Sequence, residues 1–285
     1  MVSSVKIIEC PRDAMQGIKS HFIPTETKAK YINSLLKVGF DTIDFGSFVS
    51  PKAIPQMKDT AEVLSKLDLS TTKSKLLAIV ANVRGANDAS QFEEIDYLGY
   101  PFSISENFQM RNTHKTIEQS IDTLKEVLAI ANRSNKEVVA YLSMGFGNPY
   151  GDPWSVEVVG EWTEKLSGFG VKILSLSDTI GSSTPEDIDY LFSNLIPSYP
   201  QIEFGAHLHT TPAKWHEKID SAFKAGCRRF DGAIKGYGGC PMAKDELTGN
   251  MPTEKLLSYF TTNKVETNIK PMSFESAYNK ALEVF

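Results

Sequence analysis

The sequence has few cysteines, no excess of basic residues and no long uninterrupted apolar run. Its three cysteines, Cys10, Cys227 and Cys240, are odd in number and widely spaced, which disfavours a disulfide framework and leaves a free reactive thiol open. Lysine and arginine total 30 against 35 acidic residues. Because the two signs are mixed along the chain, we expect no broad basic surface for nucleic acid. Residues 1–10 lead directly into a β-like run, so we expect neither a signal peptide nor a membrane span, and a cytoplasmic location.

The 285 residues also contain no recognisable linker. Apolar runs typical of β-strands alternate along the chain with segments of helical period. Eight strands are predicted, at residues 5–10, 42–46, 76–82, 95–103, 138–144, 171–177, 202–209 and 229–234. Helices are predicted at residues 25–38, 54–67, 86–92, 115–132, 155–169, 185–195 and 212–225, with a further C-terminal helix at 274–285. This alternation favours one α/β domain over residues 1–285, a closed (β/α)8 TIM barrel, with an open doubly wound sheet as the alternative.

The seventh predicted strand ends in His207-Leu208-His209. Residues two apart in a strand project from the same face, so the two imidazoles would lie side by side, which is an arrangement typical of metal ligands. Neighbouring carbonyl groups could equally satisfy such a pair, so it does not by itself decide between a metal site and a structural role.

Polar residues also follow most of the other predicted strands. In a TIM barrel the active site lies at the C-terminal ends of the strands. The residues at these ends are Glu9, Arg12, Asp13, Asp44, Asn82, Ser103, Ser105, Glu106, Asp178 and, beyond the last strand, Cys240 and Asn250. One such residue is usually a helix cap or a turn residue, but the whole ring indicates an active site.

Several short motifs give the chain a family resemblance. They are PRDAMQ at residues 11–16, GSFVSPK at 46–52 with PQM at 55–57, SENF at 105–108, DTIG at 178–181, HLH at 207–209, GGCP at 238–241 and GN at 249–250. With them the chain resembles, from Lys6 to about Leu257, the hydroxymethylglutaryl-coenzyme A lyases and their relatives. These are barrel metalloenzymes that make or break carbon–carbon bonds by Claisen or aldol chemistry. The Arg-Asp pair is common to the whole superfamily, whereas SFVSPK and the glycine-flanked cysteine are more particular to the lyases.

The resemblance implies that Asp13, His207, His209 and Asn250 hold a divalent cation. A carboxylate, two imidazoles and an amide oxygen form a mixed oxygen and nitrogen set that suits Mg²⁺ or Mn²⁺. Two imidazoles and a carboxylate are also a known Zn²⁺ set, so the identity of the metal stays open. Taken alone, Asn250 is equally well interpreted as a turn residue after Gly249.

The implied reaction is cleavage of a 3-hydroxyacyl-coenzyme A thioester, hydroxymethylglutaryl-CoA in the family, to acetyl-CoA and acetoacetate. Arg12 matches the arginine that stabilises charge on the thioester oxygen, although a salt bridge to Glu9 or Asp44 is its structural alternative. Cys240 matches the cysteine that transfers a proton. Asp13 is also a candidate acceptor of the hydroxyl proton, and Asp44 and Asp178 are acid-base or supporting candidates.

An acyl-CoA substrate is the partner that the resemblance implies, and a homodimer is compatible with it. The mixed charges and the absence of a long apolar run lead us to expect no nucleic acid or membrane partner. The candidate substrate-binding residues are Gln16, Lys19, Asn82, Ser105 and Arg111. Coenzyme A carries phosphates that require cations, although a single lysine or arginine is more often a solvated surface charge.

Three positions depart from the family pattern. Ala14 stands where glycine is usual, Asp44 where the lyases have glutamate, and Thr210 where an aspartate normally follows the second histidine. Changes of this size in a catalytic site alter rate or substrate. They therefore leave two alternatives beside the lyase: a related condensing synthase or metal aldolase, and a non-catalytic barrel that binds thioesters.

Overall fold

The structure is a computed structural model that describes residues 4–239 and 248–285. Cys240, the predicted proton-transfer residue, lies outside the described residues.

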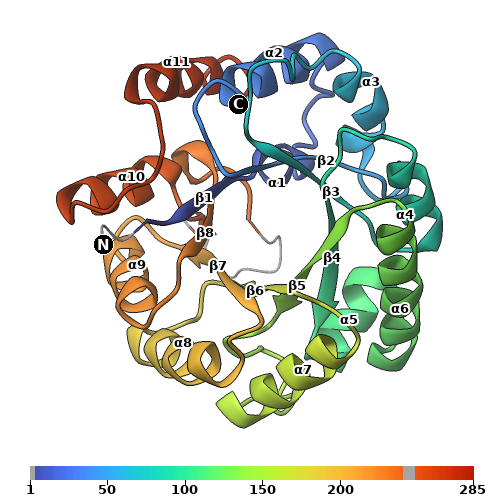
Figure 1. The fold of residues 1–285 in the computed structure, drawn as a ribbon, viewed down its shortest axis with the longest axis vertical. Coiled ribbons are helices and arrows are strands. Elements are labelled where there is room, and N and C mark those ends of the chain that lie inside the picture. Colours follow the sequence, from blue (N-terminus) through green and yellow to red (C-terminus); the bar gives the residue numbers. More distant parts are fainter. Residues whose placement is uncertain (1–3, 240–247) are drawn as a thin grey trace.

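Eight parallel strands close into a barrel, which confirms the fold predicted from the sequence (Figure 1). Each strand pairs with the next along the chain, and β8 also pairs with β1. The strands are β1 (Lys6–Glu9), β2 (Thr42–Ser47), β3 (Lys75–Ile79), β4 (Tyr97–Ser103), β5 (Glu137–Ser143), β6 (Ile173–Asp178), β7 (Glu203–Thr210) and β8 (Arg229–Gly232). Because all run the same way, their C-terminal ends meet at one mouth of the barrel.

Helices surround the barrel (Figure 1). They are α1 (Pro11–Gln16), α2 (Thr25–Leu35), α3 (Thr60–Leu64), α4 (Val83–Ser90), α5 (Glu106–Thr113), α6 (Ile117–Arg133), α7 (Val156–Gly168), α8 (Pro185–Ser198), α9 (Trp215–Lys224), α10 (Thr253–Thr262) and α11 (Pro271–Ala281), with 3₁₀ turns η1 (Pro55–Met57) and η2 (Ile234–Gly236). At α8 the Thr184 hydroxyl accepts from the Asp187 amide and Pro185 occupies the first turn, both of which favour the start of a helix.

The elements differ from the prediction mainly near the barrel mouth. The helix predicted at residues 54–67 is two short pieces, η1 and α3, and α1, α5 and α10 were not predicted. The third strand ends at Ile79, and Asn82 is the N-cap of α4, where its side chain accepts a hydrogen bond from the Gly85 amide. The eighth strand ends at Gly232 because the chain turns into η2.

The barrel interior is apolar on one side and polar on the other. Strands β3 to β6 contribute a small buried cluster of Leu77, Ile79, Tyr97, Val139, Tyr141 and Ile173. On β7 the residues two apart are His207 and His209, and on β8 they are Arg229 and Asp231. Side chains alternate between the two faces of a strand, so every second residue points into the barrel. These inward-facing residues are apolar on β3 to β6, and on β7 and β8 they include candidate ligands and charged groups.

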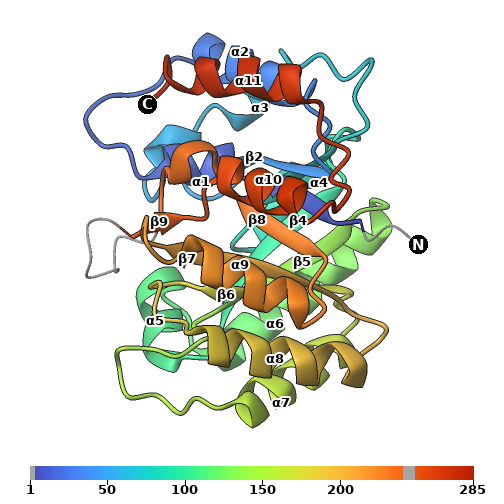
Figure 2. The same ribbon diagram turned by 90° about the vertical axis from the view of Figure 1, so that its left-hand side faces the viewer.

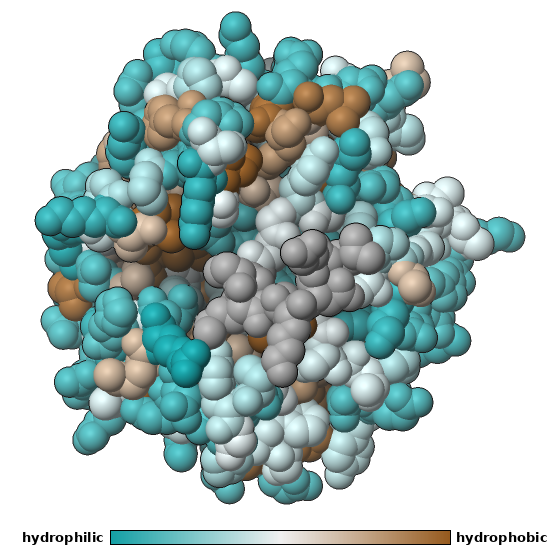
Figure 3. All heavy atoms as spheres, turned by 180° about the vertical axis from the view of Figure 1, so that it is seen from behind, coloured by the Kyte–Doolittle hydropathy of each residue, from teal (hydrophilic) through white to brown (hydrophobic). Residues whose placement is uncertain are grey.

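The extra helix α11 packs against α2 on the outside of the barrel (Figure 2). Edge-to-face ring contacts join Tyr31 to Phe285 and Phe40 to Phe274, so the C-terminal segment covers the outer surface of α2. The face turned away from the viewer in Figure 1 is mainly hydrophilic, with hydrophobic residues in separate patches (Figure 3). Within residues 4–239 and 248–285, none of the helices combines the length and apolar character that crossing a membrane requires.

Candidate active site

The short helix α1 begins directly after β1 and carries Arg12 and Asp13 at the barrel mouth. Cys10 is its N-cap and Pro11 occupies its first turn, where the missing proline N–H costs no hydrogen bond. Arg12 and Asp13 are each only 8% exposed, so both charges are held inside the protein. Ala14 lies within this helix and is not among the positive-φ residues. The usual glycine is therefore not required here for a left-handed backbone conformation.

Asp13, His207 and His209 converge at this mouth. One ligand atom from each can be chosen so that all three lie within 4.8 Å of one another. The two imidazole rings are neighbours on β7, with centroids 5.4 Å apart, as expected for residues two apart in a strand. The three side chains thus form a ligand cluster between β1 and β7.

His209 gives this cluster its strongest indication of a missing partner. The side chain is buried, and neither ring nitrogen has a hydrogen-bond partner among the described residues. Burial and the adjacent His207 lower the pKa of His209 to about 4, so its imidazole is neutral at physiological pH. Buried nitrogens are rarely left unsatisfied, and a neutral imidazole is the form that binds a metal. The donor set therefore fits a divalent cation.

Asn250 reaches the cluster through an element that the sequence did not predict. The two-residue strand β9 (Gly249–Asn250) pairs antiparallel with the end of β7 and sets Asn250 opposite His209. Its amide nitrogen donates to Asp13 at 2.6 Å and to the Tyr237 carbonyl at 2.8 Å. With the nitrogen directed at these two acceptors, the amide oxygen is the atom that Asn250 would offer to a cation.

Arg12 forms a buried ion pair with Asp44, whereas the Glu9 carboxyl accepts from the Ile234 amide and the Thr253 hydroxyl. The Nε of Arg12 lies 3.0 and 3.2 Å from the two oxygens of Asp44, its Nη2 lies 2.5 Å from one of them, and its Nη1 donates to Asp13 at 3.1 Å. Burial lowers the pKa of Arg12, but Asp44 and Asp13 raise it above its ordinary value. The shorter aspartate in place of the family's glutamate therefore still reaches the arginine.

The two carboxyl groups next to Arg12 titrate differently. Burial alone raises the pKa of Asp13, but Arg12 and the two imidazoles lower it below its ordinary value. Burial raises the pKa of Asp44 to about 6, against the opposing effect of Arg12. Asp13 is thus a carboxylate at all physiological pH values, which a metal ligand must be.

Asp178 lies at the end of β6, where both of its oxygens are engaged. One accepts from the Ser183 amide at 3.2 Å, and the other accepts from the Ser183 hydroxyl at 2.5 Å and from Lys218 at 2.6 Å. The Lys218 ammonium also donates to the carbonyls of Gly181 and His209. This fully buried lysine therefore ties the end of β6 to the end of β7, where His209 lies.

The predicted substrate-binding residues are spread around the mouth. The Gln16 amide donates to Asp13 at 2.5 Å, so it belongs to the cluster. Asn82 and Ser105 are the N-caps of α4 and α5, and the Ser105 hydroxyl also bonds to Asp152. Lys19 is exposed in the segment after α1. Arg111 on α5 lies 4.7 Å from the ring centroid of Tyr150.

A glycine next to the ligand cluster, Gly238, packs too closely against its neighbours to carry a side chain. Gly238 has φ +84°, and a Cβ there would lie 2.6 Å from the Asp13 carbonyl oxygen and 2.9 Å from the Asn250 amide nitrogen. No side chain fits at that position without displacing backbone. Gly238, which is a described residue, therefore lies directly against the Asp13 backbone and the Asn250 side chain.

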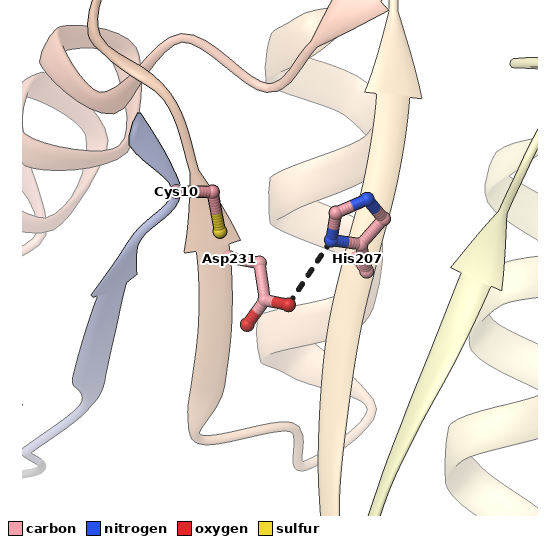
Figure 4. A group of neighbouring side chains, drawn as sticks. All are labelled: Cys10, His207 and Asp231. Carbon is pink, nitrogen blue, oxygen red and sulfur yellow. Dashed lines mark hydrogen bonds and ion pairs between the residues drawn. The ribbon is translucent and has the colours of Figure 1, made fainter. Parts of the chain in front are cut away.

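Sequence reasoning missed Asp231, which lies beneath His207 (Figure 4). Its Oδ2 is 3.0 Å from Nδ1 of His207. Cys10, which also points into this part of the barrel, can bring a ligand atom within 4.8 Å of both residues. The signal was present in the sequence, because Arg229 and Asp231 place charged residues at alternate positions of an apolar strand.

The site as a whole brings together groups with complementary roles. It has a neutral imidazole and a carboxylate that can bind a cation, and a buried guanidinium that stays positive. Negative charge that develops on a bound oxygen between them would be stabilised, because the site is largely shielded from water. Chemistry that passes through an oxyanion or enolate is therefore what this arrangement favours.

Comparison with known proteins gives a consistent result. The HMGL-like family model matches residues 5–280. A hydroxymethylglutaryl-CoA lyase from Bacillus subtilis is 33% identical over 260 residues, which are 91% of this chain and 86% of that protein. The crystal structure of the HMG-CoA lyase of Bacillus subtilis matches with a TM-score of 0.92 at 33% identity, over 99% of this chain and 93% of that one. An HMG-CoA lyase from Acinetobacter baumannii, solved in complex with coenzyme A and 3-methylmalate, matches with a TM-score of 0.89 at 27% identity, over 99% and 91% of the two chains.

Proposed function

Because this chain belongs to the HMGL-like family and is a hydroxymethylglutaryl-CoA lyase-like carbon–carbon lyase, we propose that it cleaves hydroxymethylglutaryl-CoA to acetyl-CoA and acetoacetate with the help of a divalent cation. The observation that carries this proposal is the convergence of Asp13, His207 and His209 beside the buried Arg12. An acyl-CoA substrate is supported by the HMG-CoA lyase that was solved with coenzyme A.

Asp13, His207 and His209 would hold the cation together with the amide oxygen of Asn250. We propose Mg²⁺ or Mn²⁺, because oxygen donors make up half of this set, and Zn²⁺ is compatible with the same residues. When bound, the cation would bind the substrate hydroxyl and carboxylate oxygens, which orients the bond to be broken and favours loss of the hydroxyl proton.

We assign Arg12 to the thioester oxygen, where negative charge appears as the carbon–carbon bond breaks. Hydrogen bonds within the described residues use three of its five N–H groups, and the remaining N–H groups can meet a substrate oxygen. Asp44 would fix the guanidinium in place, since both of its oxygens contact Arg12. A donor that is already oriented needs no reorganisation during the reaction, which is the main advantage of such a site over water.

We assign proton transfer to two groups, supported by a third. Asp13 would accept the hydroxyl proton, since it is ionised and lies within the ligand cluster. We assign Cys240 the delivery of a proton to the enolate carbon, because it matches the cysteine that transfers a proton in the family and a thiol is a suitable acid at neutral pH. Asp178 is assigned a supporting role, since its contacts with Lys218 and Ser183 hold the ends of β6 and β7.

The remaining predicted residues would bind the rest of the substrate. Gln16 lies against Asp13 and would contact the acyl group. Ser105 and Asn82 would act mainly through the caps that hold α5 and α4 at the mouth. Lys19 and Arg111 are the cations that we assign to the phosphates of coenzyme A.

The departures at Asp44 and Thr210 do not remove these groups. Asp44 retains the ion pair with Arg12, and the Thr210 hydroxyl donates to the Thr211 carbonyl at 3.1 Å. The substituted positions therefore change the surroundings of the site and leave its ligands and its guanidinium in place. We expect any difference from the relatives to appear in the choice of acyl group.

A panel of 3-hydroxyacyl-CoA thioesters tests the proposal. Purified protein is treated with a chelator, resupplied with Mg²⁺ or Mn²⁺, and assayed for acetyl-CoA and the keto acid. We expect cleavage of hydroxymethylglutaryl-CoA that disappears on chelation and returns with either ion. The His207→Ala variant should contain no bound metal and show no cleavage, since it removes one ligand of the cation.

Two results would contradict the proposal. One is that metal-loaded protein cleaves none of the thioesters. The other is that it releases free coenzyme A from acetyl-CoA and a keto acid, which would identify a condensing synthase.

A further inference from the structure

We propose that Asp231 is a positioning residue for the cation site: it holds a proton on Nδ1 of His207, so that Nε2 is the atom presented to the metal. This inference rests on the proposed function only in taking His207 as a metal ligand. Asp231 is 3% exposed, its Oδ2 lies 3.0 Å from Nδ1, and the two residues come from the neighbouring strands β8 and β7.

The orientation of the ring supports this role. Figure 4 shows Nδ1 turned down toward Asp231, while the second ring nitrogen points away from it, toward the C-terminal end of β7. That end of the strand is where Asp13 and His209 lie. A histidine whose one nitrogen donates to a carboxylate has a fixed tautomer and a more basic second nitrogen, both of which strengthen metal binding.

A second charge explains how Asp231 is tolerated inside the barrel. Arg229 lies two residues earlier on β8, on the same face of the strand, and is 1% exposed. Its nearest carboxylates at the other end of the barrel are Glu203 and Asp41, at 3.5 and 3.7 Å. Burial lowers the pKa of Arg229, but the charge of Asp231 is the largest influence that raises it above its ordinary value. Inside the barrel, the carboxylate of Asp231 thus lies between the positive guanidinium of Arg229 and the imidazole of His207, which borders the cation site.

A different assignment for the same residues is a second metal site formed by Cys10, His207 and Asp231, whose ligand atoms lie within 4.8 Å of one another. Two observations disfavour it. Burial, followed by the charges of Asp231 and Asp44, raises the pKa of the Cys10 thiol well above its ordinary value, whereas the thiolate is the form that binds metal. The guanidinium of Arg229 also opposes a second cation beside Asp231.

Direct measurement of Mn²⁺ binding, by the electron paramagnetic resonance signal of the free ion, tests the role of Asp231 without recourse to activity. We expect Asp231→Asn to weaken binding by about 10- to 100-fold, which is the usual effect of losing a carboxylate that supports a metal-bound histidine. Cys10→Ser is the matched control, because it changes the third member of the same group with little change in volume. It should alter the dissociation constant by less than about threefold.

The tautomer itself is measured by ¹⁵N NMR of the histidine side chains in metal-free wild-type protein, at alkaline pH, where the imidazole is neutral. In the wild type we expect the His207 ring proton to be on Nδ1. In Asp231→Asn we expect it to be on Nε2, or to exchange between the two ring nitrogens. This readout separates a positioning role from general support of the fold, and in the wild type it does not depend on a variant that folds.

The possible failures are distinguishable. Equal Mn²⁺ affinity in folded Asp231→Asn, a proton on Nε2 in the wild type, or a loss in Cys10→Ser as large as in Asp231→Asn would each overturn the positioning role. Cleavage that fails in the wild type, while Mn²⁺ binding depends on Asp231, would instead overturn the proposed reaction and leave Asp231 with its role at the cation site.

Discussion

At the scale of single residues, Arg12 combines two tasks that oppose each other. Its hydrogen bonds to Asp44 and Asp13, which use three of its five N–H groups, hold the guanidinium in one orientation, yet they also neutralise part of the charge that a substrate oxygen would meet. The planar shape of arginine reconciles the two, because one edge can pair with carboxylates while the other faces the substrate. A lysine offers a single charged point and cannot do both.

We therefore expect Arg12→Lys to lower kcat by about 10²- to 10³-fold, the range seen when one oriented oxyanion donor is removed. Binding of Mn²⁺ should change little, since the ligands are untouched. Steady-state kinetics on hydroxymethylglutaryl-CoA and metal titration measure the two quantities. The exposed Arg84→Lys serves as the control, since among the described residues Arg84 forms a long ion pair with Asp88, at 3.9 Å, on the surface of α4. A kcat within threefold of the wild type would exclude Arg12 from the thioester oxygen.

At the scale of elements, the strands and the longer helices were predictable because they repeat. Helix α6 spans seventeen residues with a clear apolar face, and such a pattern survives variation at single positions. Short elements carry no such repeat. Helix α1 has six residues, and β9 has two, so neither repeats its pattern often enough to be recognised, although they place Arg12, Asp13 and Asn250. Two of the elements that carry site residues were thus not visible in the sequence, whereas the strand that carries both histidines was.

The same contrast holds for the site residues. The convergence of Asp13 and the two histidines follows from the closure of the barrel together with the strand ends, both of which the sequence indicates. Lys218 was not found, because a lysine on a helix is usually a solvated charge. Lys218 lies four residues before Ala222, which is buried, and residues four apart share a face of a helix. This spacing indicates that Lys218 faces inward.

Lys218 gives a prediction about how the site elements are held together. The Lys218→Met variant keeps the length of the side chain but leaves the Asp178 carboxylate buried without its cation, and it frees the His209 carbonyl. We expect the free energy of unfolding to fall by about 3–5 kcal/mol, as for other buried ion pairs that lose one partner. Urea denaturation measures this change.

Lys224→Met is the matched control, because Lys224 lies on the same helix and pairs with Asp220 on the surface, where its side chain is 70% exposed. We expect a change within about 0.5 kcal/mol. If the two variants lost similar stability, the Lys218 network would not hold the ends of β6 and β7.

At the scale of the whole molecule, the charges are distributed unevenly around the barrel. The interior side of β3 to β6 is mainly apolar, whereas buried charged and imidazole groups lie on β1, β2, β7 and β8, on α1, and at the end of β6, where Asp178 pairs with Lys218. Each buried charge lowers stability unless a partner compensates it. The free energy of unfolding should therefore depend on pH through the buried ionisable group whose charge is least offset by nearby partners.

That group is Glu9, which lies on β1 with no cation beside it among the described contacts. Its carboxyl accepts hydrogen bonds from the Ile234 amide at 2.9 Å and from the Thr253 hydroxyl at 2.6 Å. Burial raises the pKa of Glu9 to about 8, although these two bonds lower it. At neutral pH the folded protein therefore holds Glu9 mostly protonated.

The sign of the pH dependence follows from this difference. In the unfolded chain Glu9 has its ordinary pKa of 4.5, whereas in the folded protein its pKa is about 8. Between these values the folded state binds more protons, so the contribution of Glu9 to stability is complete below pH 4.5 and is lost as pH rises to about 8. The slope is at most about 1.4 kcal/mol per pH unit.

The Glu9→Gln variant tests this account, because its amide oxygen can accept from the Ile234 amide, its amide nitrogen can donate to the Thr253 hydroxyl oxygen, and the group does not ionise. We expect the difference in unfolding free energy between variant and wild type to shift in favour of the variant as pH rises from 5 to 8, and to level off above that. Urea denaturation at several pH values measures it. Glu26→Gln, at an exposed site where Lys66 lowers the pKa of the carboxyl, should show no such rise. If the difference in unfolding free energy stayed constant from pH 5 to 8, Glu9 would be ionised in the folded protein throughout this range, and its pKa would not be raised by burial.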